Sequence, residues 1–334
     1  MPHVVTISLE KAQSLCIQAA ISAGASEAVA KSLSFATVAA EARGQTTVGI
    51  LHFFDYLDAI KDGRLNGIAS PKFSYPTKAA VVADADGGIA QLGFDLSLEK
   101  LVNITKDIGV SIFTQANAYT CGALGFYAEQ LAVRGFIAFG FGNSPALMAA
   151  GGAKQRIYGT NPFTFAAPQV DKKVLLVDQA SSATAYVNIR AAAEEGKALP
   201  EGWAIDSEGQ PTIDPMKALK GSLLAFGGPK GGNIALMVEV MSTLSGANWS
   251  IDAPSFLEGN ESPRVGMTVI AIEPSLINEH FTQRLSDHLS TLSTTFGVYI
   301  PGAEKSSKLA ESMANGINID SEIYARLSNI KLSN

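Results

Sequence analysis

The sequence contains little cysteine and no long hydrophobic run. Cys16 and Cys121 are its two cysteines among 334 residues, so neither a disulfide framework nor a zinc site made of cysteine and histidine is expected. No apolar stretch reaches the ~18 residues that a membrane helix needs, and the opening MPHVVTISLEKA lacks the apolar core of a signal peptide. We therefore expect free thiols, no metal site and a cytoplasmic protein that does not enter a membrane.

Basic residues are scarce as well. The chain has 25 lysines and arginines against 31 aspartates and glutamates, a formal net charge of −6, and no basic run. Nucleic acids and anionic membranes attract concentrated positive charge, so neither is expected as a partner. A hydrophobic content of 47% and a charged content of 17% describe a soluble globular protein, and 334 residues allow two or three lobes.

Two nucleotide-binding fingerprints are missing. The P-loop pattern GxxxxGK[ST] does not occur. Gly140-Phe141-Gly142-Asn143-Ser144-Pro145 follows a predicted strand, but Pro145 stands where the dinucleotide fingerprint has its third glycine. The sequence therefore argues against a Rossmann domain.

The most informative segment that is present runs from Leu175 to Ser182 and reads LLVDQASS. A short apolar run bounded by polar residues predicts a buried strand, so Asp178 would lie where that strand leaves the core. Burial disfavours the charged form of a carboxyl group and suits it to proton transfer, unless hydrogen bonds or a cation compensate. An equally weighted alternative is that Asp178 caps the turn that follows.

Two further segments have the composition of ligand-binding loops. Tyr158 to Phe163 reads YGTNPF and leads into an apolar run, and Gly227 to Gly232 reads GGPKGG and opens another. In the second segment glycines let the backbone approach a ligand, Lys230 adds a positive charge, and a helix N-terminus offers free N–H groups to an anion. This suits a phosphate or a carboxylate, although such a string is more often an ordinary loop.

The hydrophobic pattern predicts helices at both ends and an α/β middle. Ser8 and Ser26 are expected to cap helices that end near Gly24 and Ala42, and a third helix is expected from Thr46 or Thr47 to about Lys61. Strands are then predicted at 79–83, 109–113, 136–141, 163–166, 174–178 and 267–272. Intervening helices are predicted at 96–106, 123–134, 188–195 and 233–244, and helical patterns return at 274–292 and 305–330.

These segments resemble the type-2 malate/L-lactate dehydrogenase family, as do Asp86-Gly87-Gly88 and the stretch PEGWAIDSEGQPTIDP from Pro200 to Pro215. The family includes reductases of the cyclic imino acids Δ1-piperideine-2-carboxylate and Δ1-pyrroline-2-carboxylate, ureidoglycolate dehydrogenase and diketogulonate reductase. The likeness extends from the helix at Ser8 to Pro301-Gly302. It implies an α/β fold in which a non-Rossmann mixed β-sheet binds NAD(P) and is flanked by helices.

The resemblance also implies how the chain is divided. Residues 1–73 would form an N-terminal helical lobe packed with C-terminal helices in 303–334, and residues 74–302 a mixed α/β region of one or two lobes that binds cofactor and substrate. The terminal helices would support a homodimer. The expected small molecules are NADPH or NADH and a small carboxylate substrate.

The chain departs from the family at its acid/base motif. In the family the third helix begins with Ser-His-Gly, in which histidine is the proton donor, and an arginine one turn later holds the substrate carboxylate. Aligned on its glycines, this sequence has Thr47 at the serine, Val48 at the histidine and His52 at the arginine. His52 is therefore expected to be a substitute acid, a weaker carboxylate anchor when protonated, or a half-buried helix histidine beside Phe53 and Phe54.

By resemblance, Asp178 is carried over as the acid/base or orienting carboxylate and Thr160 as a contact of the substrate carboxylate. Thr47 and His52 complete the expected catalytic group, and His52 also counts as a substrate contact. A second departure lies at Asn117 to Leu124, where two family histidines are absent but Gly122 remains. The expected cofactor surround is Thr120, Cys121, Gly122, Ala123, Leu124, Leu176, Val177, Asp178, Gln179, Ala180, Ser181, Ser182, Pro229, Lys230, Gly302, Ala303 and Glu304.

The loss of the histidine favours one reaction within the family. A cyclic imine carries a basic nitrogen that can be protonated in water before hydride arrives, whereas a ketone oxygen becomes basic only as hydride adds. The expected activity is therefore reduction of a Δ1-pyrroline-2-carboxylate or Δ1-piperideine-2-carboxylate type imine. The alternatives are a malate- or lactate-type 2-hydroxyacid dehydrogenase that uses His52, and a non-catalytic paralogue that binds NAD(P) or a metabolite.

Overall fold

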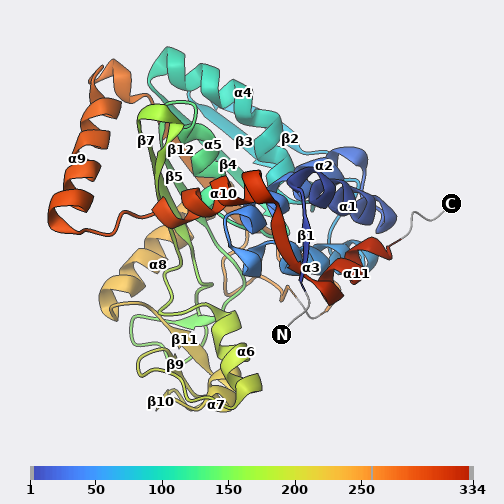
Figure 1. Ribbon diagram of the computed structural model, residues 1–334. Helices are drawn as coiled ribbons and strands as arrows, with labels where there is room; N and C mark the ends of the chain where they lie inside the picture. Colours follow the sequence, from blue (N-terminus) through green and yellow to red (C-terminus); the bar gives the residue numbers. More distant parts are fainter. Residues whose placement is uncertain (1–3, 257–258, 331–334) are drawn as a thin grey trace.

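A mixed seven-stranded sheet forms the centre of the molecule. In the computed structural model, which describes residues 4–256 and 259–330, its strand order is β2-β3-β4-β12-β5-β7-β8 (Figure 1). The strands are β2 (Lys72–Thr77), β3 (Ala80–Asp84), β4 (Val110–Ala118), β12 (Val265–Ile272), β5 (Ile137–Gly142), β7 (Phe163–Pro168) and β8 (Val174–Gln179). β3 and β4 are parallel, and the other neighbours in this sheet are antiparallel. The predicted α/β fold with a mixed, non-Rossmann sheet is confirmed.

Helices α4 (Ala90–Ile108) and α5 (Gly125–Ala132) pack on this sheet. Phe94 of α4 meets Phe113 of β4 edge to face at a centroid distance of 5.6 Å, and it meets Tyr127 of α5 at 5.0 Å. All three side chains are fully buried. Such edge-to-face contacts add to the free energy of burying the rings, so they hold α4 and α5 in register over the strands.

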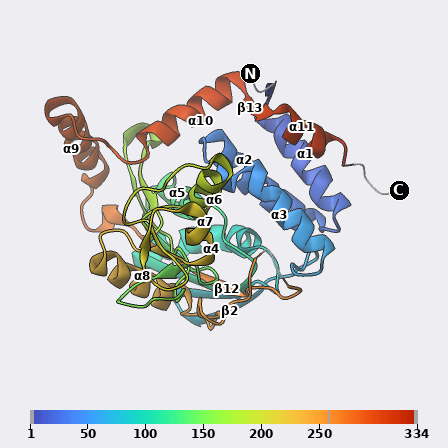
Figure 2. The ribbon, with the colours of Figure 1, turned by 90° about the horizontal axis from the view of Figure 1, so that it is seen from below.

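The two ends of the chain form a helical lobe beside the sheet (Figure 2). The N-terminal part has β1 (Val4–Ile7), α1 (Leu9–Ser22), α2 (Glu27–Ala42) and α3 (Ile50–Lys61), and the C-terminal part has α10 (Ala303–Asn315), β13 (Ile317–Asp320) and α11 (Ser321–Ser328). β1 and β13 pair antiparallel and bring the ends together. The bounds of this lobe at residues 73 and 303 stay a prediction.

The predicted helix starts at Ser8 and Ser26 are confirmed, because their hydroxyls accept from the backbone N–H groups of Lys11 and Val29 at 3.2 and 3.3 Å. The prediction of one continuous third helix from Thr46 or Thr47 was wrong. A 3-10 turn (Thr46–Val48) precedes Gly49, and α3 begins after it. Glu41 Oε2 accepts from the backbone N–H of Ile50 at 2.8 Å and so caps α3 through a side chain far back in the sequence.

A second, small sheet lies below the main one in Figure 1. Its order is β10-β9-β11-β6, with β6 (Met148–Ala149), β9 (Ala204–Ile205), β10 (Pro211–Thr212) and β11 (Ser222–Leu224). It is accompanied by α6 (Tyr186–Glu195) and α7 (Pro215–Lys220), which share a separate hydrophobic cluster with its strands. The sequence pattern missed these strands because two or three residues are too few to show an alternation.

The remaining helices are α8 (Pro229–Ser242), which packs against β5 and β12, and α9 (Phe281–Phe296), which projects as an arm (Figures 1 and 2). α9 touches the short 3-10 turns Val170–Lys172 and Pro274–Leu276. The predicted helical tail at 305–330 was wrong in one respect, since β13 interrupts it. β2 was missed, and α4 begins at Ala90, before the predicted start at residue 96.

Three further features concern the described residues 4–256 and 259–330. No helix there combines the length and apolar character that crossing a bilayer requires. No group of three or more histidine, cysteine, aspartate and glutamate side chains there is placed to hold a metal ion. Cys16 and Cys121 are free thiols, and both are buried.

Asp95 generates a prediction about stability. This α4 carboxyl accepts a hydrogen bond from Ser32 of α2, and burial raises its pKa from 3.8 to about 6. The folded state therefore binds this proton more tightly than the unfolded chain does. The resulting contribution to the free energy of unfolding is fully present below pH 4 and is lost as pH rises through 6. Asp95→Asn, which stays neutral, should therefore stabilise the fold at pH 8 by about 1–3 kcal/mol, measured as the free energy of unfolding in urea.

The matched control is Asp287→Asn, which replaces an exposed aspartate on α9. It should leave the unfolding free energy unchanged at every pH. If Asp95→Asn unfolds at the same or a lower urea concentration than the wild type at pH 8, the burial of Asp95 does not carry the cost that we assign to it.

Candidate active site

Asp178 lies at the end of β8 with both carboxylate oxygens engaged. Gln45 Nε2 and Lys305 Nζ each donate to its Oδ2 at 3.0 Å, and the backbone N–H of Gly125 donates to its Oδ1 at 3.1 Å. The side chain is only 9% exposed. The compensation that a carboxylate needs when it leaves an apolar strand is thus supplied by one cation and two neutral donors.

Close backbone approaches make this arrangement possible. Gly125 opens α5, and a Cβ there would lie 2.8 Å from Asp178 Cγ. Gly302 precedes α10 with φ +86°, and a Cβ there would lie 2.8 Å from Leu176 Cβ. A larger residue at either position would push a helix away from β8. The two glycines let the N-terminus of α5 and the first turn of α10 reach the same carboxylate.

Three of the predicted cofactor segments meet around Asp178. Gln45, Ala123, Gly125 and Leu176 line one small hollow. Cys121 is buried nearby, and burial together with the negative charge of Asp178 raises the pKa of its thiol to about 12. The structure therefore brings together the segments 120–124, 176–178 and 302–304, although their contact with a cofactor stays a prediction.

The residues that follow β8 hydrogen bond to the loops at Thr160 and Gly227. Ser181 N–H donates to the Thr160 carbonyl at 2.8 Å, and Ser181 Oγ donates to the Asn161 carbonyl at 2.6 Å. On its other side, the N–H of Phe226 donates to the Ser181 carbonyl at 3.0 Å. Thr160 and the glycine turn that begins at Gly227 are therefore both fixed against the residues that follow β8. The structure thus places side by side the three segments that the sequence analysis singled out.

A pocket of about 740 Å³ opens at this glycine turn. Gly227 and Gly228 adopt positive φ (+58° and +61°), and Pro229 occupies the first turn of α8. No side chain or backbone atom lies within 4 Å of a Cβ built on either glycine, so the turn is open to a ligand. Lys154 lines the pocket and Lys230 is exposed beside it, so the pocket combines free backbone donors with positive charge.

His52 is held apart from Asp178. Its Nδ1 lies 2.7 Å from Asp55 Oδ2, and its ring packs edge to face on Tyr56 at 4.9 Å. Tyr56 Oη accepts from Gln91 Nε2 at 3.2 Å, and a Cβ at Gly122 would lie 3.3 Å from that oxygen. His52 thus reaches the 120–124 turn through Tyr56, and within the described part of the chain no hydrogen bond joins it to Asp178.

The loop before α3 carries the other predicted catalytic position. Thr47 is exposed in the 3-10 turn, and Val48 is partly buried beside it. Gln45, which does contact Asp178, lies two and three residues before them. The structure therefore places this loop at the site, while the catalytic role of Thr47 stays a prediction.

Sequence reasoning missed three partners of Asp178, namely Gln45, Gly125 and Lys305. The resemblance pointed to the neighbouring segments but gave no signal for these side chains. Lys305 follows the expected segment 302–304 directly, so a wider window would have included it.

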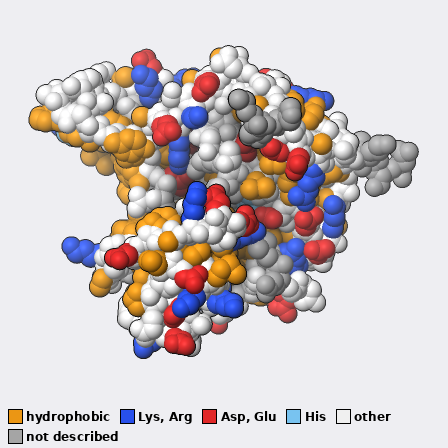
Figure 3. All heavy atoms as spheres, turned by 60° about the horizontal axis from the view of Figure 1, so that its bottom comes forward, with side chains coloured by type: hydrophobic (Ala, Val, Ile, Leu, Met, Phe, Trp, Pro, Cys, Tyr) orange, Lys and Arg blue, Asp and Glu red, His pale blue; other side chains and the backbone are white. Residues whose placement is uncertain are grey.

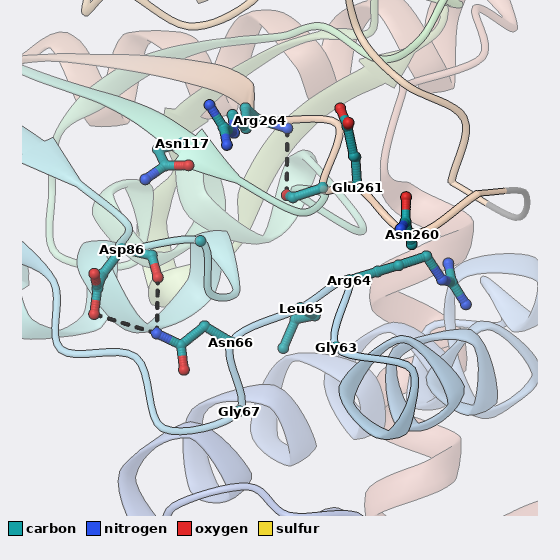
Figure 4. A pocket seen from close by; sticks show the side chains of 12 residues that line it. Gly63, Arg64, Leu65, Asn66, Gly67, Asp86, Asn117, Asn260, Glu261 and Arg264 are labelled. Atoms are coloured by element: carbon teal, nitrogen blue, oxygen red, sulfur yellow. Dashed lines mark hydrogen bonds between the residues drawn. The ribbon is translucent and has the colours of Figure 1, made fainter.

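A polar pocket of about 720 Å³ lies elsewhere and contains none of the predicted site residues (Figure 4). Two of its four charged side chains, those of Arg64 and Asp86, are bonded within the protein. Arg64 donates to Asp62 Oδ2 at 3.0 Å and to Tyr119 Oη at 3.2 Å, and Asn66 Nδ2 donates to Asp86. These bonds fix the turn before the 120–124 segment, so we assign this pocket a structural role.

Comparison with known proteins identifies the family. A family model described as malate/L-lactate dehydrogenase matches residues 7–328. The chain belongs to this family. The predicted resemblance is thereby confirmed, and so is the prediction that the protein is an oxidoreductase.

Individual relatives differ in what they act on. The chain is 33% identical over 300 residues to a Δ1-pyrroline-2-carboxylate/Δ1-piperideine-2-carboxylate reductase of Pseudomonas putida, covering 87% of this chain and 88% of that protein. It is 30% identical to a (2R)-3-sulfolactate dehydrogenase (NADP(+)) of Chromohalobacter salexigens, with 90% of each covered. The crystal structure of Δ1-piperideine-2-carboxylate reductase from Pseudomonas syringae pv. tomato superposes with a TM-score of 0.93 at 31% identity, over 98% of this chain and 99% of that one.

The contact between Gly125 and Asp178 yields a prediction. Gly125→Ala should displace the carboxylate from its N–H donor, because the new methyl would overlap Asp178. We expect turnover to fall by about 10-fold or more, since ångström-scale misplacement at a reacting centre costs that much or more. The measurement is kcat with the preferred substrate, with circular dichroism to verify the fold.

The control is Gly135→Ala, just after the other end of α5, where no atom lies within 4 Å of the added Cβ. It should leave kcat within about twofold. Unchanged kcat in Gly125→Ala would mean that the position of Asp178 does not matter for turnover.

Proposed function

We propose that the protein is an NAD(P)H-dependent reductase of a small cyclic 2-imino carboxylate. The reaction would convert a Δ1-pyrroline-2-carboxylate or Δ1-piperideine-2-carboxylate type imine into proline or pipecolate. The names of the relatives from Pseudomonas putida and Pseudomonas syringae support this class of substrate.

The observation that carries the proposal is that, among the described residues, the hydrogen-bond partners of the Asp178 carboxylate include no histidine. Asp178 is bonded to an ammonium, an amide and a backbone N–H. Val48 occupies the position of the family's acid and cannot transfer a proton. His52 is engaged with Asp55 instead. An imine suits such a site because its nitrogen is already basic and depends less on a strong, dedicated acid than a ketone oxygen does.

The residues present fit a nicotinamide cofactor. The turn from Thr120 to Gly122, the end of β8 and the start of α10 meet at Asp178, and the glycine turn beside Lys230 offers open backbone N–H groups to a phosphate. NAD(P)H, when bound, supplies a hydride to the substrate carbon. Thr160 remains the proposed contact of the substrate carboxylate, held in place by Ser181.

A 2-hydroxyacid dehydrogenase of the malate or lactate type is the second candidate. The relative from Chromohalobacter salexigens is named for such a substrate, sulfolactate. In this case His52, whose imidazole is polarised by Asp55 at 2.7 Å, would transfer the proton. Reaction at His52 would require the substrate to bind against α3 and Tyr56.

The deciding experiment follows NADPH and NADH oxidation at 340 nm with Δ1-pyrroline-2-carboxylate, Δ1-piperideine-2-carboxylate, pyruvate and oxaloacetate side by side. We expect turnover with the cyclic imines and at least about 10-fold lower kcat/KM with the oxo acids. Asp178→Asn should abolish imine turnover without unfolding the protein.

Preference for the oxo acids would contradict the proposal and favour the dehydrogenase. In that case His52→Ala should lower kcat by more than about 10²-fold if His52 is the acid, or raise KM alone if it is an anchor. For an imine reductase, His52→Ala leaves kcat largely intact. Binding of NADPH without turnover of any of the four substrates would identify a non-catalytic protein.

We also propose that the protein works as a cytoplasmic homodimer. Its two buried free thiols suit a reducing compartment. Large apolar side chains are exposed on α8 and the segment after it, where Leu236, Val240 and Leu244 are 49–59% exposed. Figure 3 shows hydrophobic side chains gathered on the side of the molecule where α8 and α9 lie. Patches of this kind mark contact surfaces.

Light scattering should give a mass near twice 34.9 kDa. Val240→Asp should shift that mass toward the monomer, because a charge on the exposed face of α8 would be desolvated in the interface. Val187→Asp, an exposed valine of α6, is the control. A dimer that survives Val240→Asp would place the interface elsewhere.

A further inference from the structure

We propose that Lys305 is the proton donor of the reaction and takes the place of the missing histidine. The inference rests on the proposed reductase function and names the acid at that same site. The juxtaposition that carries it is the 3.0 Å contact between Lys305 Nζ and Asp178 Oδ2, at the point where segments from four parts of the chain converge.

The contacts of Asp178 indicate different roles for the Asp178 carboxylate and the Lys305 ammonium. Gln45 and Gly125 hold the carboxylate in one orientation, and Lys305 completes its coordination. In all three contacts the carboxylate accepts a hydrogen bond, so it is not placed as the donor. The ammonium carries three protons, of which one bonds to Asp178. Its side chain is 27% exposed, against 9% for Asp178, so its other N–H groups remain accessible from the outside of the pair.

Other groups on the elements next to α10 are less suited to the task. Burial raises the pKa of Cys121 to about 12, which leaves its thiol a very weak acid. Glu41 is used to cap α3 through the N–H of Ile50. Arg43 is paired with Glu129 at 2.7 Å, and a guanidinium does not release its proton in proteins. Lys305 combines an ionisable proton with access to solvent.

The chemical step balances with these groups alone. A hydride supplied by bound NAD(P)H would form the new C–H bond at the carbon that bears the carboxylate, and the C=N π electrons would become a second lone pair on nitrogen. That lone pair takes a proton from Lys305 Nζ, where an N–H bond breaks. Lys305 is left as a neutral amine and regains a proton from water, while Asp178 stays charged. The N–H of the neutral secondary amine is a far weaker acid than the lysine ammonium, so the transfer runs strongly toward the product.

The test compares three variants on the preferred cyclic imine from pH 6 to pH 10. Lys305→Met removes the donor, and Lys305→Arg keeps the positive charge beside Asp178 but cannot release a proton. Lys308→Met is the matched control, since Lys308 is an exposed lysine one turn along the same helix. NADPH binding to each is measured separately by fluorescence titration.

We expect the wild type and Lys308→Met to keep kcat nearly constant as the imine loses its own proton. Lys305→Met should lose kcat about tenfold for each pH unit, reaching about 10²-fold or more at high pH, and it should approach the wild type at low pH where the imine arrives protonated. Lys305→Arg should follow Lys305→Met. NADPH affinity should change by less than about threefold in both.

Several results would overturn the assignment. Full activity of Lys305→Arg at high pH would show that the charge only positions Asp178. A large loss of NADPH affinity with kcat retained at saturation would make Lys305 a cofactor ligand. A loss of kcat that is equal at every pH would indicate a structural role. Absence of wild-type turnover on any imine would overturn the proposed function itself, and the donor with it.

Discussion

The need to compensate one nearly buried negative charge shapes the site. Asp178 ends an apolar strand, and a carboxylate there without partners would cost several kcal/mol in lost hydration. Its donors come from the segment after α2, the N-terminus of α5 and the first turn of α10. Because these partners lie 53 to 133 residues from Asp178 in sequence, the helical lobe and the sheet must dock in one way for the charge to be satisfied.

That docking depends on small residues at the points of closest approach. Gly125 and Gly302 let two helices reach β8, and Gly49 lets Glu41 lie against the start of α3, where a Cβ would come within 2.2 Å of its carboxylate. The pairing of β1 with β13 anchors α10 from its far end. The position of Lys305 thus follows from contacts at both ends of its helix, which gives a side chain from the C-terminal segment a fixed place beside the strand.

Local features of the fold could be predicted from the sequence. Ser8 and Ser26 were found as helix caps because a capping hydroxyl bonds to N–H groups only a few residues away. The strand that ends at Asp178 was found because its apolar run is bounded on both sides. The break at Gly49 was not predicted, because the Glu41 carboxylate that caps α3 lies nine residues earlier. The strand β13 was not predicted either, because its partner strand lies at the other end of the chain.

The sequence by itself determined the apolar strand that carries Asp178 and the glycine turn at Gly227, since both are matters of composition and short spacing. Its motifs also carried the resemblance to the family, and that resemblance predicts that Val48 stands where the family has a histidine. Only the tertiary structure decided which groups surround the carboxylate. It left His52 paired with Asp55 on its own helix, and it brought Lys305 Nζ to 3.0 Å from Asp178 Oδ2. The physical reason is that a charge buried at a strand end is satisfied by whatever donors the packing of distant segments delivers, and that packing leaves no local pattern in the sequence.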